Sequence, residues 1–239
     1  MSDQIVSIKK MTLAYGDTVA VPELDLDIKK GELLALLGPS GCGKTTTMRA
    51  IAGLLAPKSG AIFIDGRDVT RVPAHKRGIG LVFQSYALFP HLSSFENVAF
   101  GLRLRKLPSA EVKVKVEAGL SSVGILHLAA RMPAEMSGGQ QQRLSLARSL
   151  VMEPKVLLLD EPLSNLDARL RLEMRTELQR VQRETGVTMV FVTHDQSEAL
   201  ALADRIVLMK DGKVVQIGTP DVLYNKPVDA FAADFMGFE

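Results

Sequence analysis

The feature that most constrains this 239-residue sequence is a short glycine-rich segment, residues 38–45 (GPSGCGKT). It matches the pattern G-x-x-x-x-G-K-[ST], in which glycines leave backbone N–H groups free to surround phosphate oxygens. An almost continuous apolar run, residues 32–37, precedes it and is typical of a strand buried on both faces of a parallel sheet. Apolar side chains at helical spacing follow in residues 44–55, and Pro57 ends that pattern. The segment therefore predicts a strand, a phosphate-binding loop and a helix, in that order.

The end of this loop carries the side chains that a magnesium nucleotide requires. Lys44 is placed to contact the β- and γ-phosphates, and the hydroxyl of Thr45 is placed to bind Mg²⁺. We therefore expect ATP and Mg²⁺ as cofactors. The residues of this segment that we expect to contact the nucleotide are Pro39, Ser40, Gly41, Cys42, Gly43, Lys44, Thr45 and Thr46.

A second buried strand, predicted over residues 156–159, ends in two neighbouring acids, Asp160 and Glu161. We expect Asp160 to hold the magnesium ion, usually through water. Because side chains alternate along a strand, Glu161 cannot do the same job, and it is the better candidate to polarise the attacking water. The simpler interpretation, that both acids only cap the next segment, is disfavoured beside a complete phosphate loop.

Residues 137–143 (SGGQQQR) identify a family. They match the signature motif of ATP-binding cassette (ABC) proteins, and the chain resembles the nucleotide-binding subunit of an ABC transporter. The resemblance implies that this segment opens a helix whose amino end binds the γ-phosphate of ATP held by a partner subunit, which fits the positive end of a helix. The implied nucleotide contacts are Ser137, Gly139 and Gln140. Met136 stands where the motif more often has leucine, a minor departure because the two side chains have similar volume.

Three further positions match the family one by one. Gln84, after the apolar run 79–83, corresponds to the glutamine that approaches Mg²⁺ and water, and His194 to the histidine that contacts the γ-phosphate. Tyr15 stands where the family places an aromatic ring against adenine, although a tyrosine that ends an amphipathic strand is often only a packed surface residue. The catalytic residues implied are Glu161, His194, Gln84 and Lys44, and the metal ligands are Thr45, Gln84 and Asp160.

The resemblance implies an ATPase whose site is shared between two copies of the chain, with residues 164–167 crossing the interface. Hydrolysis of ATP to ADP and phosphate would drive solute import through separate membrane permeases, with a solute-binding protein as an indirect partner. The expected permease contact is the face beside Gln84, which includes Tyr86, Leu88, Phe89 and Leu92. The chain would lie as a peripheral subunit on the cytoplasmic face of the bacterial inner membrane.

Within the family, residues 83–92, 96–100 and 193–199 resemble the import ATPases for sugars, polyamines, phosphonates and ferric iron. Phe89 in place of tyrosine favours the last three solutes, although sugar uptake remains possible. Members of this group commonly continue into a β-rich regulatory domain. We expect that domain to be absent from residues 1–239, either because the sequence is truncated or because it is a short form.

Patterning predicts an α/β fold in a single ABC ATPase domain over residues 1–239: a parallel P-loop NTPase sheet with an antiparallel β subdomain and a helical subdomain. Runs at 5–8, 11–15, 24–28 and 61–66 predict the antiparallel part, and residues from about 90 to 150 the helical part that carries the signature. From residue 155 onward, apolar runs alternate with helical patterns at 168–184 and 196–203, as in a parallel sheet. Residues 206–217 read as a hairpin.

Composition limits the other function classes. A formal charge of +2 gives no electrostatic reason to expect a nucleic-acid partner, and one cysteine excludes an internal disulfide. No apolar run approaches the roughly 20 residues that span a bilayer, so transport requires separate membrane subunits. An ABC ATPase acting on DNA or ribosomes would ordinarily carry a long heptad insertion or two cassettes, and a phosphate-loop kinase would have no reason to carry residues 137–140. An inactive relic is disfavoured because Lys44, Asp160, Glu161 and His194 are intact.

Overall fold

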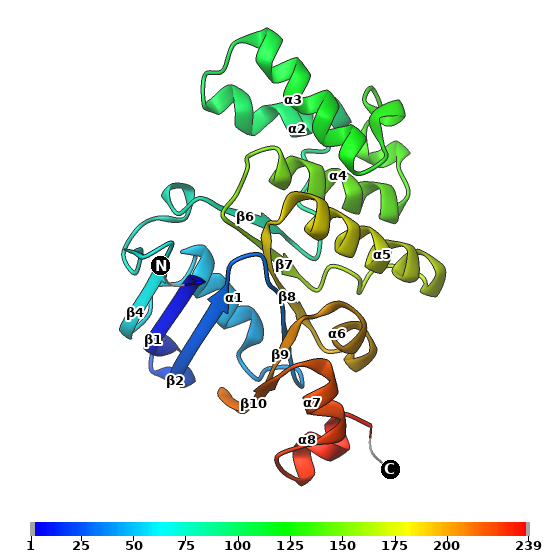
Figure 1. The fold of residues 1–239 in the computed structure, drawn as a ribbon. Helices are drawn as coiled ribbons and strands as arrows, with labels where there is room; N and C mark the ends of the chain where they lie inside the picture. The colour runs from blue at the N-terminus through cyan, green and yellow to red at the C-terminus, as the bar shows by residue number, and fades with distance from the viewer. Residues whose placement is uncertain (1–2, 238–239) are drawn as a thin grey trace.

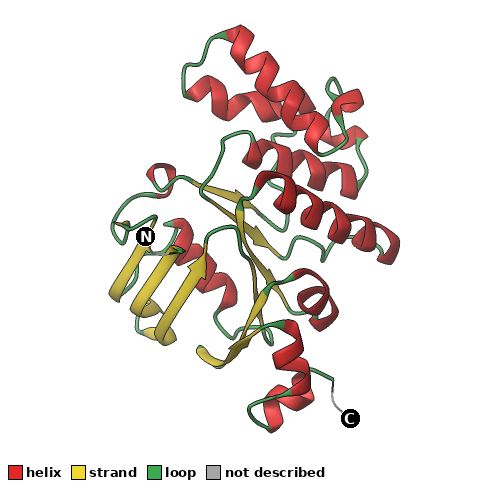
Figure 2. Cartoon of the chain, viewed as in Figure 1, coloured by secondary structure: helices red, strands yellow, loops and turns green. Residues whose placement is uncertain are grey.

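The computed structural model describes residues 3–237, and the boundary predicted at residues 238–239 lies outside them. Two β-sheets and the helices that cover them make up this part of the chain (Figure 1, Figure 2). One sheet has six strands in the order β10-β9-β3-β8-β7-β6, and the other has four in the order β2-β1-β4-β5. The α/β fold class with separate parallel and antiparallel parts is therefore confirmed.

The six-stranded sheet forms the centre of the molecule. Strands β6, β7, β8, β3 and β9 run parallel, and β10 pairs antiparallel with β9. Every residue of β3 and β8 is buried, as the continuous apolar runs predicted. The bounds are β3 (Leu33–Leu37), β6 (Ile79–Val82), β7 (Val156–Asp160), β8 (Thr188–Thr193), β9 (Arg205–Lys210) and β10 (Lys213–Gly218).

Alternate residues of these central strands enter different cores. Leu34 and Leu36 pack toward helix α1 (Lys44–Ala52) and the antiparallel sheet, whereas Leu33, Ala35 and Leu37 pack toward the opposite side. That opposite side is covered by α5 (Ala168–Thr185) and α6 (Gln196–Leu202). The sheet is buried on both faces, so its strand ends and loops are the parts left to bind a ligand.

The antiparallel sheet consists of β1 (Gln4–Tyr15), β2 (Thr18–Lys29), β4 (Ser59–Ile64) and β5 (Arg67–Asp68). The sequence predicted two strands at 5–8 and 11–15, but the structure has a single strand with a register shift between Ile8 and Met11. Both side chains are fully buried although they are three positions apart, which regular alternation cannot achieve. The register shift, at which Lys10 takes a φ of 45°, allows the buried side chains of both halves of β1 to lie on the same face of the sheet.

A helical region lies at one end of the molecule, far from the carboxy-terminal helices α7 (Pro220–Asn225) and α8 (Ala230–Phe235) (Figure 1). Its main helices are α2 (Ser94–Leu104), α3 (Ser109–Ser122) and α4 (Gly138–Leu150). Short 3₁₀ turns at Leu126–Leu128 and Pro133–Glu135 connect α3 to α4, and another lies at Ala74–Lys76. Helix α3 buries Val112, Val116 and Leu120, which are four positions apart, so its amphipathic pattern places one face in the core.

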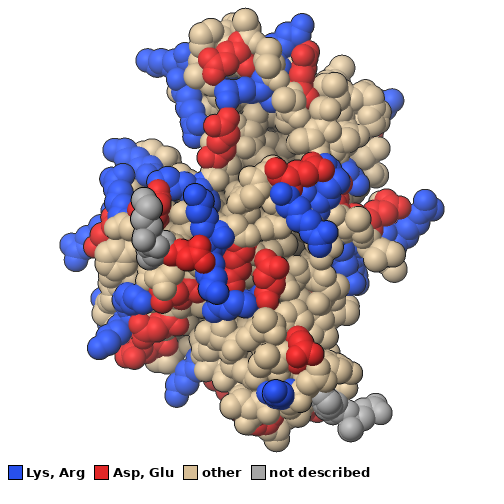
Figure 3. Space-filling model, in the orientation of Figure 1, with Lys and Arg blue, Asp and Glu red and all other residues tan. Residues whose placement is uncertain are grey.

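The face of the molecule drawn in Figure 3 shows no strong charge bias. Basic and acidic side chains are interspersed on the face drawn in Figure 3, in agreement with the formal charge of +2. Among the helices of residues 3–237, none combines the length and the apolar character needed to cross a bilayer.

Candidate functional site

The phosphate loop leaves the carboxyl end of β3 and runs into α1, which begins at Lys44. Gly38 and Gly43 both have positive φ, at 149° and 98°. A Cβ on Gly38 would lie 2.2 Å from the carbonyl oxygen of Met209, and one on Gly43 would lie 2.7 Å from Val21 Cγ2. Glycine is therefore required at both positions by backbone conformation and by space.

The ammonium group of Lys44 is folded over this loop. Its Nζ donates hydrogen bonds to the carbonyl oxygens of Gly38 at 2.7 Å and Pro39 at 2.8 Å, and only 5% of the residue is exposed. The buried Sγ of Cys42 lies 3.6 Å from the same nitrogen. A buried cation held by backbone carbonyls, beside a helix amino terminus, is suited to an anionic ligand such as a phosphate.

Thr45 and Asp160 face each other across the end of β7. Thr45 Oγ1 donates a hydrogen bond to Asp160 Oδ1 at 3.3 Å. Burial raises the pKa of Asp160, and the neighbouring Glu161 charge adds to that rise, while Thr45 and Arg49 oppose it. A hydroxyl and a carboxylate oxygen fit Mg²⁺, which prefers oxygen ligands and keeps several waters or phosphates. Residues 3–237 contain no cluster of three or more His, Cys, Asp or Glu that could hold a metal alone.

Glu161 lies between the other two predicted catalytic side chains. Its Oε2 accepts a hydrogen bond from Gln84 Nε2 at 3.1 Å, and its Oε1 lies 3.4 Å from His194 Nδ1. The three residues follow β6, β7 and β8, which are adjacent parallel strands, so their side chains meet at one edge of the sheet. Glu161 also has a φ of 44°, a strained value for a residue other than glycine that is concentrated at functional sites.

The loop at residues 164–167 is tied to this cluster. Ser164 Oγ donates to the carbonyl oxygen of Glu161 at 3.0 Å and accepts from Gln84 Nε2 at 3.1 Å. Asn165 Nδ2 donates to the carbonyl oxygen of Gln84 at 2.9 Å. Sequence reasoning placed this loop at a dimer interface but missed its bonds to Gln84, because no local signal links residues about 80 positions apart.

The signature segment is held at the amino end of α4. Ser137 caps the helix: its Oγ accepts from Gln140 N at 3.4 Å, and Gln140 Oε1 accepts from Ser137 N at 2.9 Å. Gly139 is buried, and a Cβ there would lie 3.3 Å from Leu170 Cδ2. Within residues 3–237, no hydrogen bond or ion pair joins residues 137–140 to residues 38–46. The structure therefore does not bring Ser137, Gly139 and Gln140 together with the phosphate loop of the same chain.

Tyr15 ends β1 with 48% of the residue exposed. Its partner strand, β2, contains Ala20 and reaches the phosphate loop. A Cβ placed on Gly43 would lie 3.4 Å from the carbonyl oxygen of Ala20. The ring thus belongs to a hairpin that packs beside the loop, which is compatible with the predicted adenine contact without testing it.

A second hairpin, between β9 and β10, supports the phosphate loop from the other side. Gly212 N donates to the carbonyl oxygen of Cys42 at 3.2 Å. Gly212 has a φ of 76°, and a Cβ there would lie 2.3 Å from the Ala20 carbonyl oxygen. The sequence indicated this hairpin but gave no signal for its contact with a loop some 170 residues earlier.

Arg171 of α5 connects two loops of the cluster, a role that the sequence did not suggest. Its Nη2 donates to the carbonyl oxygen of Leu166 at 3.2 Å, and its Nη1 lies 3.8 Å from Asp195 Oδ2. Its Nε lies 3.7 Å from the carboxylate of Glu198, a buried acid that accepts a 2.6 Å hydrogen bond from Thr193. Burial raises the pKa of Glu198. Arg171 therefore holds both neighbours of His194 close to α5: Asp195 directly and Thr193 through Glu198.

Known proteins resemble this chain over nearly all of its length. The sequence pattern of the family described as ABC transporter matches residues 21–164. The chain is 56% identical over 232 residues to a protein of Rhizobium etli and 55% identical over 232 residues to one of Agrobacterium fabrum, both named "Fe(3+) ions import ATP-binding protein FbpC". These alignments cover 97% of this chain and 66% of each relative, so the chain spans somewhat under two thirds of their length.

A solved structure of another protein has a similar fold. It is that of cbiO1 from Clostridium perfringens, described as part of the ABC transporter complex cbiONQ, and it is 35% identical to this chain with a TM-score of 0.88. The match covers 94% of this chain and 92% of that one.

Proposed function

This chain belongs to the ABC transporter family, and from that premise we propose that it is the ATP-hydrolysing subunit of a bacterial solute importer. One observation carries the proposal: Gln84, Glu161 and His194 meet at the edge of the sheet from which the phosphate loop leaves. The Thr45–Asp160 pair supplies the oxygen ligands for a metal beside them. A site of this composition suits phosphoryl transfer to water.

In the proposed reaction the loop amides and Lys44 hold the β- and γ-phosphates of ATP, and Lys44 exchanges its carbonyl partners for phosphate oxygens. Thr45, Asp160 and Gln84 would hold Mg²⁺, which neutralises negative charge on the phosphates. Glu161 polarises the attacking water and takes its proton, while His194 contacts the γ-phosphate. ATP and water then give ADP and phosphate.

We infer that the site is completed by a second copy of the chain. Ser137, Gly139 and Gln140 lie at the amino end of a 13-residue helix and have no bond to their own phosphate loop among the described residues. An exposed serine beside helix amides can bind a phosphate that another molecule holds. Two copies would therefore enclose two ATP molecules, with Tyr15 against adenine in each.

The proposed membrane partners are permease subunits, which this chain would join as a peripheral subunit at the cytoplasmic face. A hollow of about 380 Å³ beside Gln84 supports the predicted docking face, and Phe83, Ala87, Phe89, Phe100 and Met152 are among its lining residues. The rings of Phe89 and Phe100 lie 4.5 Å apart, and the Arg148 guanidinium lies 5.6 Å from the Phe89 ring. Such an apolar, aromatic surface is suited to a protein partner.

Ferric iron is the proposed solute, because the relatives that are 56% and 55% identical carry that solute in their names. It is one of the solutes that Phe89 favoured. Reconstitution with permeases and binding proteins of ferric-iron, phosphonate and polyamine importers tests this choice. We expect ATPase stimulation with the ferric-iron set alone.

The shared site is tested by the protein-concentration dependence of ATPase activity. If the partner completes the site, activity per subunit should rise with protein concentration and then level off. A Ser137→Arg variant should bind ATP with wild-type affinity and stay inactive, because its phosphate loop is unchanged. Constant activity per subunit at dilutions where the protein is shown to be monomeric would contradict a shared site.

A further inference from the structure

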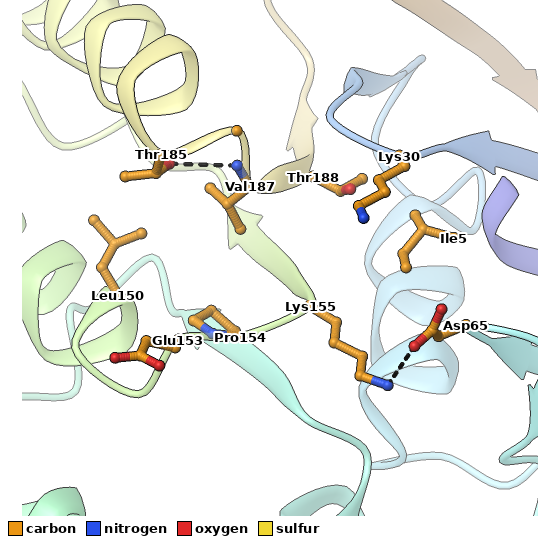
Figure 4. A pocket seen from close by; sticks show the side chains of 11 residues that line it. Ile5, Lys30, Asp65, Leu150, Glu153, Pro154, Lys155, Thr185, Val187 and Thr188 are labelled. Carbon is orange, nitrogen blue, oxygen red and sulfur yellow. Dashed lines mark hydrogen bonds and ion pairs between the residues drawn. The ribbon is translucent and has the colours of Figure 1, made fainter. Parts of the chain in front are cut away.

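A second cavity lies at the edge of the parallel sheet opposite the phosphate loop. Its volume is about 470 Å³, and it opens beside Lys30, Lys155 and Thr188, which stand at or just before the amino ends of β3, β7 and β8 (Figure 4). The phosphate loop follows the other end of β3, so the five residues of that strand, about 16 Å, separate the two. This cavity is therefore distinct from the proposed ATP site.

The walls of the cavity combine apolar and charged side chains. Its apolar residues are Ile5, Leu150, Pro154 and Val187. Figure 4 shows Leu150 and Pro154 with Glu153 on one side, and Ile5 with Lys30, Lys155 and Asp65 on the other. A cavity of this size with mixed walls is suited to a small molecule that has an apolar body and one polar end.

The charges of the cavity leave one cation without a partner. Lys155 Nζ is paired with Asp65 Oδ2 at 2.6 Å, and Glu153 Oε1 is paired with Lys115 Nζ at 2.6 Å. Lys30 Nζ has neither a hydrogen bond nor an ion pair among residues 3–237, although its charge contributes to the lowered pKa of Asp65, and Figure 4 shows it pointing into the opening. Lys30 is therefore an exposed cation at the cavity that no side chain contacts directly.

A buried hydroxyl lies beside this cation. Thr188 is 1% exposed, and its Oγ1 accepts a hydrogen bond from Gly31 N at 2.9 Å. The hydroxyl hydrogen has no acceptor within the described part of the chain, and Thr188 is among the residues that line the cavity. An ammonium and a hydroxyl donor together match one carboxylate.

We propose that this cavity binds a small amphipathic monocarboxylate. Its carboxylate lies between Lys30 and Thr188, and its apolar body lies against Leu150, Pro154 and Val187. Leu150 is the last residue of α4, and Lys30 directly follows β2 of the antiparallel sheet. A bound ligand therefore contacts the end of the signature helix and the residue that follows this strand. This site goes beyond the proposed ATPase function, and its occupancy does not depend on ATP.

The test uses the full chain without nucleotide, with 4-phenylbutyrate as the probe and its uncharged amide as the comparison. Isothermal titration should give saturable binding of the carboxylate with a Kd about tenfold below that of the amide, because only the carboxylate pairs with the cation. Hydrogen exchange should slow at residues 150–155 and 185–188 and stay unchanged at residues 38–45. Protection confined to the phosphate loop would overturn the proposal.

Two variants and one control variant separate the charge from the shape of the cavity. Lys30→Gln should raise the Kd of the carboxylate to that of the amide, whereas Lys29→Gln, which removes the same charge from a neighbour that does not line the cavity, should bind like the wild type. Val187→Phe should abolish binding of both probes by filling the space. Equal Kd values for the Lys29 and Lys30 variants, or no saturable binding of the carboxylate below about 10 mM, would show that the site does not exist.

Discussion

The side-chain amide nitrogen of Gln84 lies 3.1 Å from the carboxylate of Glu161, although the two residues are 77 positions apart. They meet because β6 and β7 are neighbours in the sheet and end at the same edge. The contact places a group that the family resemblance assigned to metal and water directly on the predicted base. A change at Gln84 is thus transmitted to Glu161 without any intermediate residue.

The first prediction concerns Glu161→Gln. The amide keeps the shape and can accept the bond from Gln84, but it cannot take a proton from water at neutral pH. ATP turnover should fall by about 10²–10⁴, while ATP binding persists, so the variant should accumulate as an ATP-bound dimer. Size exclusion with and without MgATP measures this. Turnover at the wild-type rate would mean that Glu161 is not the base.

Lys44→Ala should have the opposite phenotype. The buried ammonium is the charge partner expected for the β- and γ-phosphates, so its loss should weaken ATP binding and leave the protein monomeric. Titration with a fluorescent ATP analogue measures the affinity. Wild-type ATP affinity in this variant would show that Lys44 does not bind the phosphates.

A third prediction uses the pH dependence of stability in Asp160→Asn. Burial raises the pKa of Asp160 above its usual 3.8, so its ionised form destabilises the folded state. The stability that the protonated form provides is present below the unfolded pKa and is lost as pH rises through the folded pKa. Asn keeps an acceptor for Thr45 and does not ionise. Without nucleotide or Mg²⁺, the variant should melt above the wild type at about pH 7, and the difference should shrink toward pH 4.

A fourth prediction compares Gly212→Ala with Gly16→Ala. Both glycines have positive φ, but a Cβ on Gly212 would lie 2.3 Å from the Ala20 carbonyl oxygen, whereas one on Gly16 meets nothing within 4 Å. Gly16→Ala should lower the free energy of unfolding by about 1 kcal/mol because of backbone strain. Gly212→Ala should lower it by about 2–4 kcal/mol because the clash adds to that strain. Urea unfolding measures both. Equal costs would show that the hairpin is free to move away from the loop.

A fifth prediction assigns a positioning role to Arg171. Arg171→Gln should lower kcat with little change in ATP affinity, because it loosens the segment around His194 without touching the phosphate loop. Arg169→Gln is the matched control, since that side chain is on the same helix and is 89% exposed. Recovery of part of kcat by Arg171→Lys would distinguish positioning by charge from a loss of packing. Equal kcat in the two glutamine variants would contradict the role.

The sequence by itself determined the features whose physical cause is local. The glycines of the phosphate loop, the Ser137–Gln140 cap and the buried stripe of α3 each depend on a few neighbouring residues, and the structure contains all three. The prediction of two strands at 5–8 and 11–15 was wrong, because the register shift within β1 depends on pairing with its partner strand. The roles assigned to the site residues stay predictions, although the structure brings Thr45 to Asp160 and Gln84 to Glu161.

Only the tertiary structure decided which distant segments meet. The strand order β10-β9-β3-β8-β7-β6 differs from the order in the chain, so neighbours in space are set by packing of both sheet faces and not by sequence spacing. The bond from Gly212 to Cys42, the contacts of Arg171 and the unpaired Lys30 in the second cavity all follow from that order. A local pattern fixes the conformation of a segment, whereas the free energy that selects its partners comes from burying surfaces that lie far apart in the chain.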